Sequence, residues 1–289
     1  MIGRRWFVPW LFLLPSLIIL SLFYWWPIAN TFILSFTNAH AVRGGRFTGL
    51  DNFVRLLNDS FFHNALLNSG LFLLGVVPLL TLLPLFLAVL VNAKLPGMSF
   101  FRTIFFSPVV ASMVVAALLW SWMLRTDGLF NWILERLRII SEPISWLTDP
   151  SLALFSVLLV TTWKGLGYYM IIYLAGLQNI PEELHEAGRL DGAGAMRRFW
   201  SISVPVLRPT MVLVATLTAI SAIKVFTEVF VLTGGGPRRA SQTLVPYIYE
   251  RGISGLETGY ASAMSITLFA LVLFATLLAG RITRRRVAA

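Results

Sequence analysis

The chain has no cysteine and few charged residues, and each shortage narrows the class of protein. Without cysteine it can form neither disulfides nor thiolate metal sites. Charged residues make up 12% of the chain, whereas soluble domains usually carry about 25%. The three histidines, His40, His63 and His185, are too far apart in the sequence to suggest a ligand cluster. We therefore expect no metal site and no cofactor.

A nucleotide-binding loop is missing as well, because no Gly-x-x-x-x-Gly-Lys-Ser/Thr sequence occurs. The Gly-Gly-Gly-Pro segment at 234–237 lacks the lysine and the helical pattern that such a loop needs. The net charge of +10 would suit a nucleic-acid partner. However, the basic residues flank long apolar segments, where anionic lipid and the positive-inside rule account for them. We expect contact with membrane lipid and none with nucleic acid.

Long apolar runs dominate the chain, since 57% of its residues are hydrophobic. A helix needs about 20 apolar residues to cross the hydrocarbon core. The runs are continuous and do not alternate, which favours helices over a β-barrel. The predicted fold is an all-α membrane protein, a single transmembrane domain over residues 1–289. Its six predicted spans lie at 7–29, 65–91, 103–124, 151–176, 210–232 and 260–280.

Basic residues near the span ends predict the orientation. Arg4 and Arg5 precede the first span, which is too long for a signal-peptide core and has no cleavage site after it. Basic residues also concentrate in the 94–102 loop and the C-terminal tail. By the positive-inside rule, both termini lie in the cytoplasm. Within the second and third spans, prolines predict bends; these are Pro78, Pro84 and Pro108.

The loop at 178–209 is polar and predicts two short helices. Pro181 suits a first helical position, and the first helix is expected to run to about Leu190. Gly192 can adopt the left-handed conformation that ends a helix. Asp191 is expected to cap the second helix, and Pro205 to end it.

The same loop carries a spaced motif: Glu186-Ala187, Asp191-Gly192-Ala193, Phe199, Ile202, Pro205 and Pro209. It resembles the cytoplasmic EAA loop of permease subunits in binding-protein-dependent ABC importers. The departures from the family pattern are Gly188, where alanine is usual, and Val204, where leucine is usual. Amphipathicity alone would fit an interfacial loop without a partner equally well. The spaced motif favours a docking element.

The resemblance extends over about residues 49 to 260. It is carried by Gly49-Leu50-Asp51-Asn52-Phe53, Arg102-Thr103, Ser107-Pro108, Trp120, Gly128-Leu129-Phe130-Asn131, Thr233-Gly234-Gly235-Gly236-Pro237, Thr243-Leu244 and Tyr249. These segments look like those of the first permease subunit in maltose and glycerol-3-phosphate type systems. The resemblance implies the type I ABC importer permease fold, in the inner membrane of a bacterium or archaeon.

What the resemblance implies about function is a transporter subunit and not an enzyme. The expected partners are a second, related permease subunit, two ATP-binding subunits that hydrolyse ATP, and an extracytoplasmic solute-binding protein. The expected cargo is a sugar, an oligosaccharide, or a related polyol or glycerol-phosphate solute. The residues implied in ATPase coupling are Glu186, Ala187, Gly188, Asp191, Gly192, Ala193, Phe199, Ile202 and Pro205.

Three charged residues interrupt the predicted spans: Lys164, Lys224 and Glu228. A charge within lipid is costly, so such residues usually face protein or water. Since Lys224 and Glu228 are four residues apart, we expect them on one helix face. One interpretation is a polar substrate pathway with aromatic side chains; its residues are Trp163, Lys164, Tyr168, Tyr169, Lys224 and Glu228. A buried structural ion pair, or a carboxylate reaching the membrane surface, explains the charges equally well.

Two other functional classes remain open from the residues. A transporter that works without ATP would need no docking loop and would usually show internal repeats, and neither expectation fits. A membrane enzyme would need a cluster of His, Asp or Glu at the inner face. The only acidic cluster there is the one that matches the loop motif.

Overall fold

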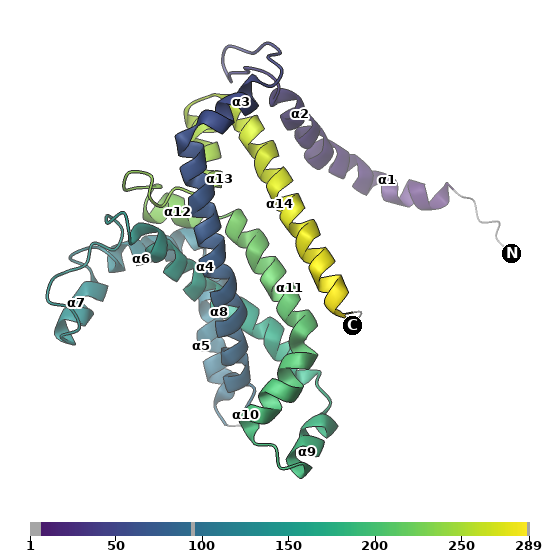
Figure 1. Ribbon diagram of the computed structural model, residues 1–289, viewed down its shortest axis with the longest axis vertical. Helices are drawn as coiled ribbons and strands as arrows, with labels where there is room; N and C mark the ends of the chain where they lie inside the picture. The colour runs from purple at the N-terminus through teal and green to yellow at the C-terminus, as the bar shows by residue number, and fades with distance from the viewer. Residues whose placement is uncertain (1–6, 94–95, 288–289) are drawn as a thin grey trace. The chain divides into compact units, whose positions relative to one another are not determined.

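The computed structural model describes residues 7–93 and 96–287, and its regular structure is helical (Figure 1). Within those ranges the only β pairing consists of two isolated bridges, Thr37 with Phe47 and His40 with Gly44. The predicted all-helical class is thereby confirmed. The basic residues Arg4, Arg5 and Lys94, which helped to predict the orientation, lie outside the described residues.

By length and composition, four helices are able to cross a membrane: Val8–Leu34, Ser60–Val91, Ala153–Gln178 and Ala195–Ile223. A bent pair, Met98–Val110 and Met113–Met123, makes a fifth if its halves form one span. A shorter apolar stretch runs from Thr258 to Phe274. The chain is therefore a multi-pass helical protein, and the count of six spans stays a prediction.

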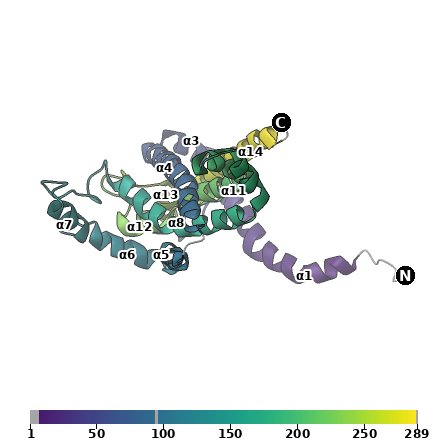
Figure 2. The same cartoon turned by 90° about the horizontal axis from the view of Figure 1, so that it is seen from below.

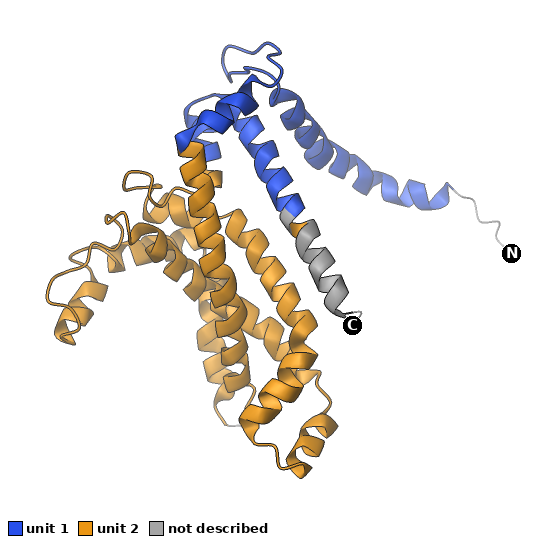
Figure 3. Ribbon diagram, in the orientation of Figure 1, with its two compact units in different colours: residues 1–60, 247–275 blue, residues 61–246, 276–289 orange. Residues whose placement is uncertain are grey.

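The described residues fall into two compact units (Figure 3). The first unit comprises residues 1–60 and 247–275. Its elements are α1 (Val8–Leu20), the π-helical turn η1 (Ser21–Trp25), α2 (Trp26–Leu34), α3 (Asp51–Asn58), the second half of α13 (Leu244–Tyr249), η3 (Glu250–Ser254) and the first part of α14 (Thr258–Val287). The helix Val8–Leu34 buries none of its most apolar window within the chain. Such a surface needs lipid or another subunit around it.

The second unit comprises residues 61–246 and 276–289. It contains α4 (Ser60–Val91), α5 (Met98–Val110), α6 (Met113–Met123), α7 (Leu129–Arg136), α8 (Ala153–Gln178), α9 (Glu182–Leu190), α10 (Ala195–Arg198), η2 (Phe199–Ser203), α11 (Val204–Ile223) and α12 (Thr227–Leu232). α4 and α8 overlap the predicted second and fourth spans, 65–91 and 151–176, and α4 begins five residues before the predicted span. α4 stays helical through both Pro78 and Pro84.

The core of this unit lies where α8 packs against α4, α5 and α11. Buried side chains recur on α4 at helical spacing, as at Phe72, Val76 and Leu80. Small residues allow close contact: a Cβ on Gly165 would stand 2.9 Å from Leu80 Cδ1. In lipid, where burial of apolar surface drives helices together only weakly, such close packing holds them in place.

Two of the predicted spans are broken. α5 and α6 meet at an angle of 99° across residues 111–112, and Figure 2 shows α5 nearly end-on while α6 lies across the view. Pro108 predicted this bend: it has no N–H for the carbonyl of Ile104, which accepts the Ser107 hydroxyl instead at 3.0 Å. The predicted span 210–232 is broken too, because α11 ends at Ile223 and α12 begins at Thr227.

Candidate functional site

The segment between α8 and α11 folds as a helical hairpin, formed by α9, α10 and η2. The N-terminal turn of α9 contains Glu182 and Glu183, whose charges favour the positive end of the helix dipole. The expected end at Leu190 is confirmed. Pro181 lies one position earlier than expected, since it is the N-cap and not the first helical residue.

The turn of the hairpin has the hydrogen bonds of a Schellman motif. The N–H of Ala193 donates to the carbonyl of Gly188 at 2.9 Å, and that of Gly192 to Arg189 at 3.0 Å. Gly192 has a φ of +73°, which confirms the left-handed conformation expected for it. Arg198 closes the turn, because its Nη1 donates to the Ala193 carbonyl at 2.7 Å.

Two expectations for the second helix are wrong. Asp191 is the C-cap of α9, and the N-cap of α10 is Gly194, which has no side chain to cap with. Pro205 does not end the helix: the helix Ala195–Ile223 continues through it. Pro205 has no N–H, and the π-helical turn η2 just before it shifts the hydrogen-bonding register, so that the proline is accommodated.

The inner side of the hairpin is closely packed and its tip is apolar. A Cβ on the buried Gly188 would stand 3.0 Å from Ile202 Cδ1 and 3.2 Å from Arg198 Cδ. At the tip, Leu190 is 90% exposed and Met196 71%. Sequence reasoning missed Leu190 and Arg198; the available signal was a leucine standing between the charged residues 189 and 191.

The motif residues themselves lie on both sides of the hairpin. Glu186 is exposed and forms a long ion pair with Arg189, 3.9 Å between Oε1 and Nη2. Ala187 and Asp191 are also exposed. Phe199 turns inward, and its ring centroid lies 6.2 Å from that of Phe86 on α4. The exposed and the inward residues therefore have different structural roles.

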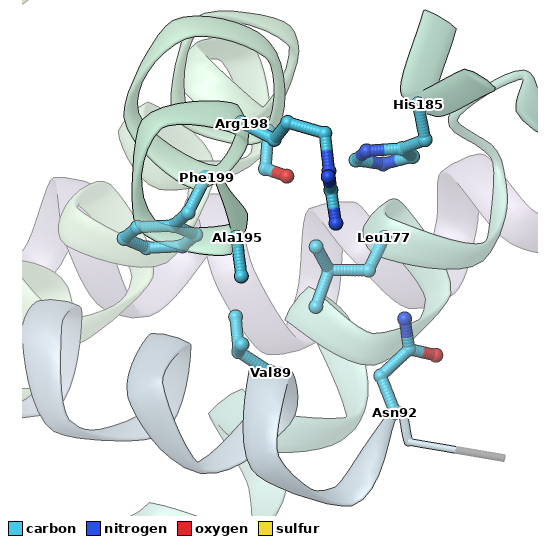
Figure 4. A pocket seen from close by; sticks show the side chains of 8 residues that line it. Val89, Asn92, Leu177, His185, Ala195, Arg198 and Phe199 are labelled. Carbon is cyan, nitrogen blue, oxygen red and sulfur yellow. The ribbon is translucent and has the colours of Figure 1, made fainter. Parts of the chain in front are cut away.

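A pocket of about 190 Å³ lies beneath the hairpin (Figure 4). It is lined by Val89, Asn92, Leu177, His185, Ala195, Arg198, Phe199 and Ser203. Figure 4 shows His185 of α9 and Arg198 of α10 pointing toward one another across it. The hairpin thus covers a small cavity against the ends of α4 and α8, and movement of α9 would change it.

Of the intramembrane charges, Lys164 on α8 reaches the break between α5 and α6. Its Nζ donates to the carbonyls of Pro108 at 3.0 Å, Val109 at 3.5 Å and Ala111 at 2.8 Å. The last carbonyls of a helix lack partners within it. Lys164 therefore supplies hydrogen bonds to the end of α5.

The expectation that Lys224 and Glu228 lie on one helix face is wrong. Lys224 is the C-cap of α11, the chain leaves the helix at Val225 and Phe226, and Glu228 belongs to α12. A continuous helix would be needed to bring residues four apart onto one face. Glu228 instead interacts electrostatically with Lys164.

The aromatic residues of the hypothetical pathway are not equivalent. The indole of Trp163 makes an edge contact with Trp120 of α6, with 5.3 Å between ring centroids. Tyr169 is buried, whereas Tyr168 beside it is 48% exposed. Lys224 is exposed as well. Of these side chains, Tyr168 and Lys224 are the ones open to a solute or another subunit.

A polar cluster in the first unit was not predicted. The hydroxyls of Tyr247 and Tyr260 both donate to Asp59 Oδ2 at 2.6 Å, and Arg251 Nε donates to the Tyr247 hydroxyl at 3.1 Å. Burial, together with the neighbouring Asp59, raises the pKa of Tyr247 to about 12. The neutral phenol is therefore the form that the cluster favours, and it links α13 to the residue after α3.

Similar proteins are known. The family described as binding-protein-dependent transport system inner membrane component matches residues 53–287. The chain is 36% identical over 282 residues to the probable ABC transporter permease protein YurN of Bacillus subtilis (strain 168), with 96% of each chain covered. It is 36% identical over 267 residues to the lactose transport system permease protein LacF of Rhizobium radiobacter, with 91% of this chain and 89% of that protein covered.

A solved structure agrees in fold. It is the bacterial alginate ABC transporter in complex with alginate pentasaccharide-bound periplasmic protein. One of its chains superposes with a TM-score of 0.84 at 24% identity, covering 98% of this chain and 96% of that one.

Proposed function

Because the chain belongs to the family of binding-protein-dependent transport system inner membrane components, and is thus a transport permease subunit and not an enzyme, we propose that it imports a carbohydrate-type solute. The solute is a sugar, an oligosaccharide, or a related polyol or glycerol-phosphate compound. The named cargo of the relative LacF supports this class. ATP hydrolysis in separate subunits drives the import, and a second related permease subunit completes the pathway.

The observation that carries the coupling role is the exposed apolar tip of the hairpin. Leu190 is 90% exposed between two charged residues, although a solvated loop gains nothing from a leucine there. The neighbouring residues Ala187 and Gly192 are small, so they let the tip approach another surface closely. We infer that the tip inserts into a cleft of an ATP-binding subunit. The polar residues Glu186 and Asp191 then face that subunit from either side.

The hairpin is also built to transmit movement. α9 packs on Ile202 and Arg198 through Gly188, and the second arm of the hairpin continues without a break into α11. A force on the tip therefore passes along one helix to the break at 224–226. Phe199, Ile202 and Pro205 lie on this connecting arm.

The test replaces Leu190 with aspartate in the complete transporter. An aspartate at the tip would have to lose its hydration in an apolar cleft, so recovery of the ATP-binding subunit in a pull-down should fall at least tenfold. The matched control is Leu137→Asp, which makes the same change at another exposed leucine. Leu137 is 64% exposed and lies outside the hairpin. Equal recovery from both variants would reject the docking role.

We further propose six spans with both termini in the cytoplasm. Reporter fusions after Arg286 and within 178–208 should then give a cytoplasmic signal. Fusions near Glu142 or Arg239 should give an external one. An external signal from the 178–208 loop would overturn both the topology and the coupling role.

The solute pathway is proposed along α8 and the broken helix after α11. Its residues are Trp163, Lys164, Tyr168, Tyr169, Lys224 and Glu228. Tyr168 and Lys224, which are exposed, are proposed to meet the solute, because a phenol ring stacks on sugar faces and an ammonium donates to hydroxyls. Cysteines at these two positions should react with a water-soluble thiol reagent, and transported solute should slow that reaction.

A further inference from the structure

Lys164 belongs to α8, but its side chain donates hydrogen bonds at the end of another helix, α5. α5 ends at Val110, and its last carbonyls have no donors within the helix. Water is absent from a bilayer core, so carbonyls freed by a break there need partners from the protein. An ammonium has three donors, and Lys164 Nζ is bound to three carbonyls at the break.

Other contacts near Lys164 also fix the positions of α5 and α6 on either side of the break. Gly167, one turn along α8, has no side chain, and a Cβ there would overlap the carbonyl of Phe105. The backbone of α5 therefore rests directly on α8. Trp163, next to Lys164 in sequence, contacts Trp120 of α6.

A basic side chain also donates hydrogen bonds to the C-terminal end of α4. Arg102 Nε and Nη2 donate to the carbonyl of Val91, the last residue of α4, at 3.1 and 2.8 Å. Cations favour helix C-termini because the helix dipole is negative there. The arginine forms its bonds near the end of a span, whereas Lys164 does so in the middle of one.

We propose that Lys164 is a positioning residue that holds the α5–α6 segment in its bent form. Without the ammonium, the freed carbonyls regain partners if residues 111 and 112 become helical, so the segment straightens. In this role Lys164 sets the position of α6.

The experiment measures the bend in the assembled transporter. Since the chain has no cysteine, spin labels can be placed at Phe100→Cys and Trp122→Cys, on the exposed surfaces of α5 and α6, with any partner cysteines removed. A straight helix would separate the two positions by about 33 Å at 1.5 Å per residue, whereas the 99° bend brings them much closer. Pulsed electron paramagnetic resonance distinguishes these distances.

Lys164→Met removes the donors and keeps an apolar stem of similar length. It should shift most of the distance distribution toward the straight form and lower uptake at least tenfold. Lys164→Arg keeps donors and should retain the short distance. Lys224→Met is the matched control for the distance measurement, because it removes an exposed lysine. A short distance in Lys164→Met, equal to that of the unaltered protein, would overturn the proposal.

If Lys164→Met does not assemble, the unaltered protein gives the answer. Amine-reactive labelling followed by mass spectrometry should modify Lys164 at least tenfold more slowly in the native transporter than in the detergent-unfolded chain. Equal rates would reject the proposed contacts. Only the uptake measurement rests on the proposed function, so a failure of the import hypothesis leaves the distance and labelling results interpretable.

Discussion

Gly188 and Ile202 lie in direct contact across the hairpin, so that a Cβ at 188 would stand 3.0 Å from Ile202 Cδ1. This spacing is tighter than an ordinary van der Waals contact. The atoms that would have to move are the end of an isoleucine and the stem of Arg198, and both are flexible. The site therefore has room for one methyl group and for little more.

Gly188→Ala should accordingly be tolerated. The methyl group displaces its neighbours by a few tenths of an ångström, while the helix gains about 1 kcal/mol from the loss of glycine. We expect unchanged uptake and an unchanged or slightly higher melting temperature of the complex. Gly188→Leu should separate the two arms of the hairpin and reduce recovery of the ATP-binding subunit. If alanine proves as damaging as leucine, the packing described here is wrong.

Gly167→Ala should be far more disruptive than its size suggests. Its methyl group would meet the backbone of Phe105 and stand 2.8 Å from Phe106 Cα, and backbone cannot rotate away. We expect overpacking of about 1–3 kcal/mol and a clear fall in uptake. Gly70→Ala on α4 is the matched control, because nothing lies within 4 Å of its Cβ position. Equal melting temperatures of the two variants would contradict the close approach of α5 and α8.

The elements that sequence predicted best are those that local rules determine. α4 follows from an uncharged apolar run and α8 from an apolar run that Lys164 alone interrupts. The turn at Gly192 follows from glycine in a polar loop. Pro108 indicated the bend after α5. These features need no knowledge of neighbouring helices.

The break at 224–226 could not be predicted in this way, because residues 223–227 contain neither glycine nor proline. Distant groups stabilise it instead: the hydroxyl of Thr243 donates to the carbonyl of Val225 at 3.4 Å. The hydrogen-bond acceptors of Lys164 could not be predicted for the same reason, because they are backbone carbonyls more than fifty residues away in the sequence. The four-residue spacing of Lys224 and Glu228 predicted a shared helix face only because the helix was expected to be continuous.

Tyr247→Phe tests the cluster around Asp59. Loss of the hydroxyl removes a 2.6 Å hydrogen bond to a carboxylate, which typically costs about 1–3 kcal/mol. We expect a lower melting temperature of the complex at neutral pH. Tyr24→Phe, which alters a 63% exposed tyrosine, is the control and should have no effect.

The same cluster predicts a pH dependence. Burial and Asp59 raise the pKa of Tyr247 to about 12, above the value of about 10 in an unfolded chain. The stabilisation by the neutral hydroxyl is then complete below about pH 10 and is lost as the pH rises toward 12. The difference in melting temperature between the unaltered protein and Tyr247→Phe should therefore shrink over that interval. A constant difference would contradict the raised pKa.

Gly192→Val should uncouple transport from ATP hydrolysis without disturbing the spans. The φ of +73° at Gly192 allows the Schellman bonds that fold α9 back on α10. A residue with a Cβ costs roughly 1–2 kcal/mol in this region, and a β-branched residue more. Asparagine, which tolerates the left-handed region better, should give an intermediate effect.

The matched control is Gly194→Val, because Gly194 has a φ of −64° and no atom within 4 Å of its Cβ position. We expect membrane insertion and pairing with the second permease to persist in all three variants. Recovery of the ATP-binding subunit and solute-stimulated hydrolysis should be highest in Gly194→Val, lower in Gly192→Asn and lowest in Gly192→Val. Normal recovery and stimulation in Gly192→Val would show that the hairpin is not the coupling element, since its turn cannot keep this geometry with valine.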